Sequence, residues 1–462
     1  MNATPSSTDQ KDRRDYAPTS DSTDRTDSTD RSDRTDGSGR TDGSGRSDRT
    51  SRSSRDGRSE AGGPGGRTVH LDSAGRGRMP DAVRALVADC AAREDRYGPH
   101  ELEEHLAHVL RTEIHDRLGA LLGVPAADTA VVTDAATAFD ALVRGLGPGR
   151  GDRIWTTPYE GVANLTALYA LRDRSRCRLE VVPLREDGDL DLEWMARHID
   201  DDVALVSVVH VPSGRGIVNP VEAIGRILAP HRCLYAVDAS YAVGQLGVDA
   251  ARTGCHLLTG DGWRFLRGPH DVGFAYLAPR LRDTFEEAAA HRPPPQNAAV
   301  AGLNAALAHH TATLTGPAGH DGPRLLPALR AAVEETPGTE LITPGLVQSG
   351  ILAFRHRELP AALVRRQLAA RGVALWKTVA QEMPLLDHPA GTALRASLHH
   401  DTTPDDITRF GDALQAVVRE ERPHPGGPRP AARHTAPAAP IPARPAGPPP
   451  PTRRHLTLCP MP

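Results

Sequence analysis

The residues best placed to do chemistry in this chain come directly after short apolar runs. In chain order they are Thr133-Asp134, Thr157-Pro158, His210-Val211, Asp238 and Thr259-Gly260. The runs before them read as β-strands, and in an open parallel sheet a ligand lies beyond the carboxyl ends of the strands. The side chains are therefore predicted to share one edge of a sheet.

The turn after Asp134 has the features of an anion site. Asp134 is a polar cap, the small residues Ala135 and Ala136 follow with Thr137, and a helix then begins. A helix N-terminus leaves backbone N–H groups free, and both hydrogen bonds and the helix dipole favour a phosphate or carboxylate there. Ordinary strand-to-helix turns share this pattern, so taken alone it is a weak indication.

Asp238 carries more information because it ends the wholly apolar run LYAVD. An ionised carboxylate in a buried segment is costly without a partner. Two interpretations fit. In one, Asp238 is a structural carboxylate that caps the following backbone. In the other, it holds a heteroaromatic nitrogen in its protonated form, as pyridoxal phosphate sites require.

Amine chemistry is limited by composition. Only two of the 55 basic residues are lysines, Lys11 and Lys377. A guanidinium stays protonated and is not a practical nucleophile, so a Schiff base must use one of these two positions. Lys11 lies in a polar tail, and Lys377 lies on an apparent strand of the C-terminal region.

The bulk properties exclude several classes of partner. A formal charge of −4 and a pI near 6.6 give no global reason to expect nucleic acid or an anionic membrane. The five cysteines form no CxxC pair, which is typical of a reduced, cytoplasmic protein. No run approaches the roughly 18 apolar residues of a membrane span, and no signal-peptide h-region is evident.

The elements that must position these residues alternate between strands and helices. Strands are expected at 130–134, 153–158, 179–184, 203–211, 233–240, 256–260 and 272–278. Several are apolar throughout, as strands covered on both faces are, so the sequence predicts a mostly parallel α/β sheet. One helix is expected to begin at Asn219-Pro220, with a side-chain N-cap and proline at the first helical position.

A second, weaker α/β region follows. Its strands are expected at 350–355, 373–377 and 393–399, and its helices at 359–371 and 404–420.

The expected organisation has five parts. A tail rich in Asp, Arg, Ser, Thr and Gly at 1–66 and a Pro/Ala-rich tail at 422–462 should be disordered. Between them lie a segment at 67–95 that joins the small domain, a large cofactor-type domain at 96–305, and a small C-terminal domain at 306–421.

Six ordered blocks resemble one known family, the class V aminotransferases of the fold-type-I pyridoxal phosphate group. That group includes cysteine desulfurases, isopenicillin N epimerase-like proteins and the C–S lyases of ergothioneine biosynthesis. The blocks are HLDSAGRGRMP (70–80), TDAATAFDALVRGL (133–146), residues 190–227, YAVDASYAVGQLGVD (235–249), LLTGDGWRFLRGPHDVGFAYL (257–277) and LRASLHHDTTPDDITRF (394–410).

The resemblance implies roles for particular residues. Ala136 and Thr137 would bind the cofactor phosphate, and Asp238 would pair with the pyridine nitrogen. Arg395 would receive the α-carboxylate of a small amino-acid-like substrate through its planar fork. Family members are usually homodimers, with a partner contact near residues 293–303 of this chain.

The departures from the family pattern concern the reaction centre. The Schiff-base lysine position is occupied by Arg264, which cannot form the internal aldimine. The ring-stacking residue aligns with Gly161, with Tyr159 as a neighbouring substitute, and the glutamine that contacts the cofactor's phenolic oxygen is Tyr241. An asparagine near the ring is replaced by Ser213-Gly214. No cysteine lies in the loop before Arg395, which argues against a persulfide mechanism.

His210 and Thr259, at the ends of neighbouring strands, complete the candidate site. The adjacent His399-His400-Asp401 could suggest a metal, but neighbouring residues on a strand point to opposite faces, so no metal site is expected.

Three functional interpretations remain open. In the first, the chain holds pyridoxal phosphate or pyridoxamine phosphate non-covalently and acts without an internal aldimine. In the second, it is an inactive pseudoenzyme that serves as a scaffold or as the partner of an active paralogue. In the third, it is a cofactor-free enzyme in which Arg264, Arg267, His210 and Arg395 form an anion pocket. A structural role for Arg264, paired with Asp238 or filling the vacated phosphate region, is equally compatible with the sequence.

Overall fold

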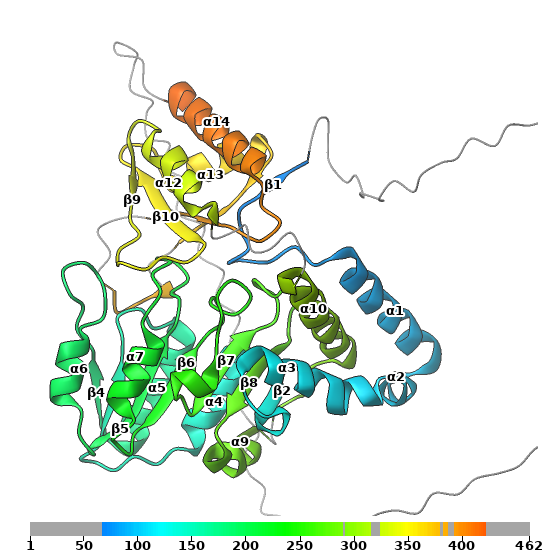
Figure 1. The fold of residues 1–462 in the computed structure, drawn as a ribbon, viewed down its shortest axis with the longest axis vertical. Coiled ribbons are helices and arrows are strands. Elements are labelled where there is room, and N and C mark those ends of the chain that lie inside the picture. The colour runs from blue at the N-terminus through cyan, green and yellow to red at the C-terminus, as the bar shows by residue number, and fades with distance from the viewer. Residues whose placement is uncertain (1–66, 290–291, 316–323, 379–381, 387–391, 422–462) are drawn as a thin grey trace, which may run out of the picture. The chain divides into compact units, whose positions relative to one another are not determined.

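The computed structural model of the chain describes residues 67–289, 292–315, 324–378, 382–386 and 392–421 (Figure 1). Both predicted tails, 1–66 and 422–462, lie outside the described residues.

A seven-stranded sheet forms at the predicted positions and confirms the α/β fold class. Its spatial order is β2-β8-β7-β6-β5-β3-β4, and only β8 runs antiparallel to its neighbours. The strands are β2 (Thr129–Val132), β3 (Arg153–Thr156), β4 (Arg178–Val181), β5 (Val203–Val209), β6 (Leu234–Asp238), β7 (Leu257–Asp261) and β8 (Gly273–Leu277).

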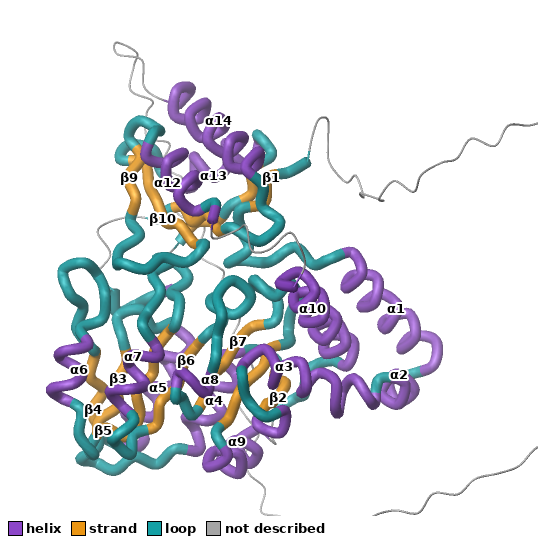
Figure 2. The backbone as a smooth tube through the Cα atoms, viewed as in Figure 1, coloured by secondary structure: helices purple, strands orange, loops and turns teal. Residues whose placement is uncertain are grey.

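Helices cover both faces of this sheet, which explains the wholly apolar strands (Figure 2). Consecutive residues of one strand, such as Ile154 and Trp155, point to opposite faces of the sheet and belong to different buried clusters. The Ile154 side packs on α4 (Ala135–Gly145), α5 (Val162–Ser175) and α9 (Arg282–Ala289). The Trp155 side packs on α3 (Ile114–Leu122), α7 (Val221–Leu228) and α10 (Asn297–Thr315).

A second, antiparallel sheet has the order β12-β13-β10-β9 and its own buried cluster. The predicted strands at 350–355 and 393–399 are confirmed, the one at 373–377 is split in two, and β9 has no counterpart among the predicted strands. The elements are β9 (Thr339–Leu341), β10 (Ile351–His356), β11 (Val373–Ala374), β12 (Trp376–Lys377), β13 (Leu394–Ser397), α12 (Leu326–Glu334), α13 (Ala361–Ala370) and α14 (Pro404–Glu421).

The N-terminal segment pairs with this C-terminal region, since β1 (Val69–His70) runs parallel to β11. The predicted domain boundaries themselves stay a prediction. The remaining elements are α1 (Asp81–Tyr97), α2 (Pro99–His105), α6 (Leu192–His198), α8 (Ala250–Thr253), a π-helical turn (Val109–Glu113) and two 3₁₀ turns (Ala126–Asp128 and Pro279–Leu281).

The predicted start of one helix is wrong. α7 begins at Val221 with Pro220 as its N-cap residue and has no side-chain cap. Asn219 is buried, and its Nδ2 instead donates to the Val209 carbonyl at 2.7 Å. A cap would need the Oδ1 of Asn219 as acceptor, but the donation to Val209 turns the amide toward the end of β5, and Oδ1 has no partner among the described residues.

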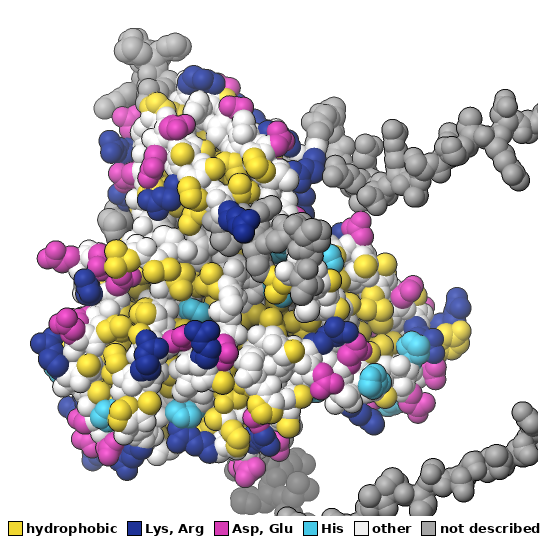
Figure 3. Space-filling model, in the orientation of Figure 1, with side chains coloured by type: hydrophobic (Ala, Val, Ile, Leu, Met, Phe, Trp, Pro, Cys, Tyr) yellow, Lys and Arg dark blue, Asp and Glu magenta, His cyan; other side chains and the backbone are white. Residues whose placement is uncertain are grey.

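On the face shown in Figure 3, basic and acidic side chains are interspersed. Within the described ranges, no helix combines the length and the apolar character that a bilayer crossing requires.

The loop that follows β5 generates the first testable prediction. Gly216 has φ +70°, and a Cβ added there would lie 2.0 Å from the Ile351 carbonyl oxygen. Gly216→Ala is therefore expected to destabilise the fold by at least about 2 kcal/mol, measured as a lower urea midpoint. Gly161→Ala is the control, because a Cβ there meets nothing within 4 Å. Equal effects of the two substitutions would contradict a steric requirement for glycine at 216.

Candidate active site

Asp238 lies at the centre of the carboxyl edge of the large sheet. It ends β6, between Val209 of β5 and Thr259 of β7. Its Oδ1 accepts hydrogen bonds from Ser240 N at 2.9 Å and Ser240 Oγ at 2.5 Å, while Oδ2 accepts one from Asn164 Nδ2 at 3.4 Å. The carboxylate is thus held in one orientation and remains partly exposed.

Glu160 is linked to Asp238 through Asn164. It is not among the candidate site residues predicted from the sequence. It is fully buried and accepts hydrogen bonds from Ser207 Oγ at 2.7 Å, Thr156 Oγ1 at 3.1 Å and Asn164 Nδ2 at 3.1 Å. Burial raises the pKa of Glu160. Asn164 bonds to both acids, so it links them. The only signal in the sequence is a Glu and an Asn four residues apart where α5 begins.

The N-terminus of α4 is capped by two carboxylates of the chain itself. Asp134 caps the helix as predicted, since its Oδ1 accepts from Thr137 N at 2.7 Å and its Oδ2 from Thr137 Oγ1 at 2.8 Å. Asp261, at the end of β7, supplies the second cap and accepts from Ala135 N at 3.1 Å. The family resemblance gives no signal for Asp261, because its role depends on a contact across the fold.

Arg264 is partly buried beside this helix end. Its Nε donates to Asp261 Oδ2 at 2.8 Å, and its Nη1 donates to the Ala74 carbonyl at 2.8 Å. The guanidinium carbon also lies 4.0 Å from the centre of the Tyr241 ring, a cation–π arrangement. The predicted pairing of Arg264 with Asp238 is therefore wrong. The partner is Asp261, the last residue of β7, three residues before Arg264.

The electrostatics keep Arg264 charged, whereas burial works against the charge of Asp261. Burial lowers the pKa of Arg264, but Tyr241, Asp261 and Asp238 outweigh that effect and raise it overall. Burial raises the pKa of Asp261, against the opposing effect of Arg264. Because each oxygen of Asp261 accepts a hydrogen bond, the geometry suits the ionised carboxylate.

Arg395 lies on β13 and is 3% exposed, so it is buried with its charge. Its contacts are long: Nη2 lies 3.4 Å from Asp72 Oδ1, and Nη1 lies 3.4 Å from the Ser213 carbonyl. Its Nε has no hydrogen-bond partner among the described residues. A buried guanidinium with spare donors suits a carboxylate ligand.

His210 directly follows one of the two strands that flank Asp238, Thr259 lies on the other, and both are buried. His210 follows β5, and burial lowers its pKa to about 4, so its imidazole is neutral. Thr259 Oγ1 and His210 Nδ1 are buried polar atoms without a partner in the described part of the chain. Tyr159 is buried in the core and donates its hydroxyl to the Gly188 carbonyl at 2.5 Å, so it is committed to another contact.

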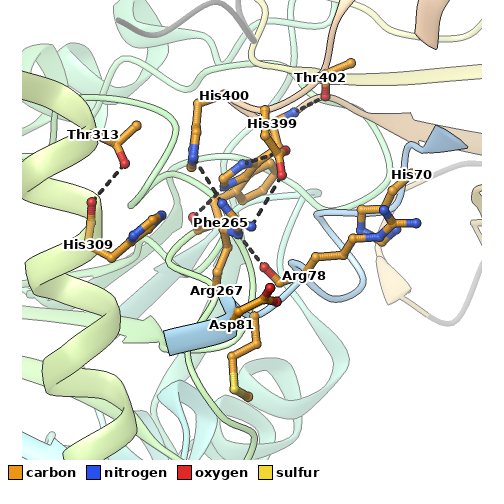
Figure 4. Close-up of polar contacts among 12 residues, drawn as sticks. His70, Arg78, Asp81, Phe265, Arg267, His309, Thr313, His399, His400 and Thr402 are labelled. Atoms are coloured by element: carbon orange, nitrogen blue, oxygen red, sulfur yellow. Dashed lines mark hydrogen bonds and ion pairs between the residues drawn. The ribbon is translucent and has the colours of Figure 1, made fainter. Parts of the chain in front are cut away.

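The second arginine of the loop, Arg267, is held by the C-terminal region (Figure 4). Its Nη1 lies 3.1 Å from His400 Nε2 and its Nη2 lies 3.3 Å from Asp401 Oδ2. His399 Nε2 lies 3.0 Å from the Phe265 carbonyl. These contacts hold Arg267 at φ +63°, a left-handed conformation that costs free energy in a non-glycine residue. Among the described residues, no group of three or more His, Cys, Asp or Glu side chains could hold a metal ion.

The pyridoxal phosphate implied by the resemblance fits these residues only in part. Asp238 is oriented for a protonated ring nitrogen, and a Cβ at Gly161 would meet open space. At the other end, however, a phosphate would meet Asp134 and Asp261 on the helix N-terminus where it has to bind. A phosphate and a carboxylate that share the same N–H groups carry like charges and repel each other strongly. The chain as folded therefore does not fit a phosphorylated cofactor.

Comparison with known proteins identifies relatives of this chain. The sequence model described as aminotransferase class-V matches residues 69–410. A probable hercynylcysteine sulfoxide lyase of Mycobacterium tuberculosis is 27% identical over 76% of this chain and 90% of its own length. A probable cysteine desulfurase of Methanothermobacter thermautotrophicus is 23% identical over 76% of this chain and 94% of its own. A probable cysteine desulfurase of Halobacterium salinarum is 31% identical over 45% of this chain, and the match spans about half of its length, 51%.

Solved structures share the fold at low identity. An apo cysteine desulfurase from Thermococcus onnurineus superposes with a TM-score of 0.68 at 19% identity, over 76% of this chain and 95% of that one. A mutant of C-DES with glycine covalently linked to its PLP cofactor superposes with a TM-score of 0.67 at 17% identity, over 75% of this chain and 96% of that one.

The buried neutral histidine yields a prediction on pH. The ordinary pKa of histidine is 6.5 and that of folded His210 is about 4. Between these two pH values the unfolded chain binds more protons than the folded chain. The free energy of unfolding is therefore highest, as far as His210 is concerned, above pH 6.5, and it falls as the pH is lowered toward 4. The loss is up to about 3 kcal/mol in urea unfolding.

His210→Asn is expected to flatten this part of the pH profile, and His105→Asn, at an exposed position, should leave it unchanged. Comparison of variants isolates His210 from Glu160, whose raised pKa acts in the opposite direction. An unaltered slope in His210→Asn would contradict the assignment.

Proposed function

We propose that this protein, which belongs to the class-V aminotransferase family, is a member without lysine-dependent pyridoxal phosphate chemistry that still binds an amino-acid-type ligand. In terms of catalysis it is a pseudoenzyme, suited to act as a scaffold or as the partner of an active paralogue. The proposal is carried by Arg264, which the resemblance aligns with the family's reactive lysine and which the fold holds in an ion pair with Asp261.

Arg264 cannot take over the role of that amine. Its guanidinium stays protonated and therefore neither attacks a carbonyl nor shuttles a proton as a neutral base. It is also bound on three sides, by Asp261, the Ala74 carbonyl and the Tyr241 ring. A side chain committed to a buried ion pair is a structural element of the site.

The same contacts disfavour a cofactor-free anion pocket. Arg264 is paired with Asp261 and Arg267 with Asp401, so neither arginine offers its charge freely to a ligand. Arg395 differs, since its Nε has no partner among the described residues and its other contacts are 3.4 Å long. We therefore assign carboxylate recognition to Arg395.

The class of ligand follows from Arg395 and from the relatives. Their names specify cysteine and hercynylcysteine sulfoxide, both amino-acid derivatives with a carboxylate. A ligand of this class would place its carboxylate on Arg395, while Asp238 offers a fixed negative charge to a cationic group. A homodimer and a cytoplasmic location remain predictions.

The proposal is tested by adding pyridoxal phosphate to the purified full chain, reducing with borohydride and measuring the intact mass. No stoichiometric adduct is expected, because the site lacks an amine. Pyridoxamine phosphate is added in parallel and followed by its absorption, and no uptake is expected. Lys377→Arg is the matched variant, since Lys377 pairs with Leu394, beside Arg395 on β13.

Two results would contradict the proposal. A stoichiometric adduct in the wild type that disappears in Lys377→Arg would show that Lys377 supplies the amine. Tight non-covalent uptake of pyridoxamine phosphate would support a family enzyme that works without an internal aldimine.

A further inference from the structure

Asp261 occupies the position that an anionic ligand of α4 would take. α4 is an eleven-residue helix whose first backbone N–H, that of Ala135, donates to Asp261 Oδ1 at 3.1 Å. The N–H of Thr137 is used by Asp134. A helix N-terminus attracts an anion through such unpaired N–H groups and through its dipole. Here carboxylates of the protein take the N–H groups of Ala135 and Thr137, and they place negative charge against the N–H of Ala136 between them.

Arg264 fixes Asp261 in this position. The side chain of Asp261 is 7% exposed and that of Arg264 is 17% exposed, and they are joined at 2.8 Å. Arg264 is in turn held by the Ala74 carbonyl, so the carboxylate cannot rotate away from the helix without leaving a buried guanidinium unpaired. Asp261 and Arg264 therefore act as one structural unit.

The backbone around the pair leaves little room for rearrangement. A Cβ at Gly77 would lie 2.1 Å from the Arg264 carbonyl oxygen, and one at Gly273 would lie 3.2 Å from the Cα of Asp134. The N-terminal segment is thus packed closely against the loop after β7, and the start of β8 is packed against the residue that caps α4. A phosphate bound at the start of α4 would therefore lie against the carboxylate of Asp261.

We propose that Asp261 is a resident anion that closes the α4 N-terminus to phosphate, and that the site accepts only ligands without a phosphate group. This inference rests on the proposed function and deepens it, because it identifies the residue that decides which ligands are excluded. The substitution at Arg264 removes the amine, whereas Asp261 removes the place for the phosphate. Restoring a lysine alone would therefore not restore the cofactor site.

Inorganic phosphate is the first probe, titrated by calorimetry into the full chain. The wild type is expected to show no binding at this site. Asp261→Ser should bind phosphate at least about tenfold more tightly, because it frees the Ala135 N–H and leaves the Arg264 guanidinium without its partner. Asp134→Ser is the matched comparison: serine preserves the N-cap and one negative charge is removed, but Asp261 still holds the Ala135 N–H, so a smaller gain in phosphate affinity than in Asp261→Ser is expected.

Asp261→Asn is the second variant, for use where the serine variant does not fold. It keeps the volume of the side chain and loses its charge, so it should also gain phosphate affinity. Equal phosphate affinity in the wild type and in both Asp261 variants would overturn the inference.

Pyridoxal phosphate is the second probe, with borohydride reduction and intact mass as the readout. Arg264→Lys alone should remain unlabelled, and the double variant Asp261→Ser, Arg264→Lys should become labelled at the introduced amine. Labelling of the single Arg264→Lys variant to the same extent would overturn the inference while leaving the proposed function intact. Stoichiometric labelling of the wild type would instead contradict the proposed function.

Discussion

The ion pair between Asp261 and Arg264 is the interaction on which the candidate site depends. It joins the end of β7 to the start of α4 and, through Arg264, to the N-terminal segment at Ala74. Either partner alone would be a buried charge without compensation, which is among the more costly features a fold can carry. Together the two charges satisfy each other and also cap a helix. The site is stable because its charges are internally paired.

The N-terminal segment extends this arrangement to the second sheet. Leu71 N donates to the Ala374 carbonyl at 2.8 Å, and Ala74 N donates to Ser397 Oγ at 2.9 Å. Asp72, between them, lies 3.4 Å from Arg395. One short stretch of chain therefore contacts both Arg395, which we propose binds a carboxylate, and Arg264, which the resemblance aligns with the family's reactive lysine. The geometry of the two halves of the site is coupled through it.

Prediction from the sequence succeeds where the cause is local. Several strands of the large sheet follow from uninterrupted apolar runs, and the Asp134 cap follows from a polar residue before small residues and a helix. It fails where a longer-range contact decides the outcome. The pattern at Asn219 predicts a cap for α7, but the Val209 carbonyl ten residues earlier takes its amide. The three-residue strand β9 lies at the edge of its sheet and carries too weak a pattern to be recognised.

The same distinction explains why family resemblance does not decide the activity. The resemblance assigns phosphate binding to Ala136 and Thr137, and this assignment stays a prediction. Whether the helix end is available, however, depends on Asp261, which lies 126 residues from Ala135 in the chain. A motif specifies the donors, and only the fold shows which acceptor already occupies them. Arg264 and Asp261 are best understood together, because the charge of each compensates the charge of the other beside the N-terminus of α4.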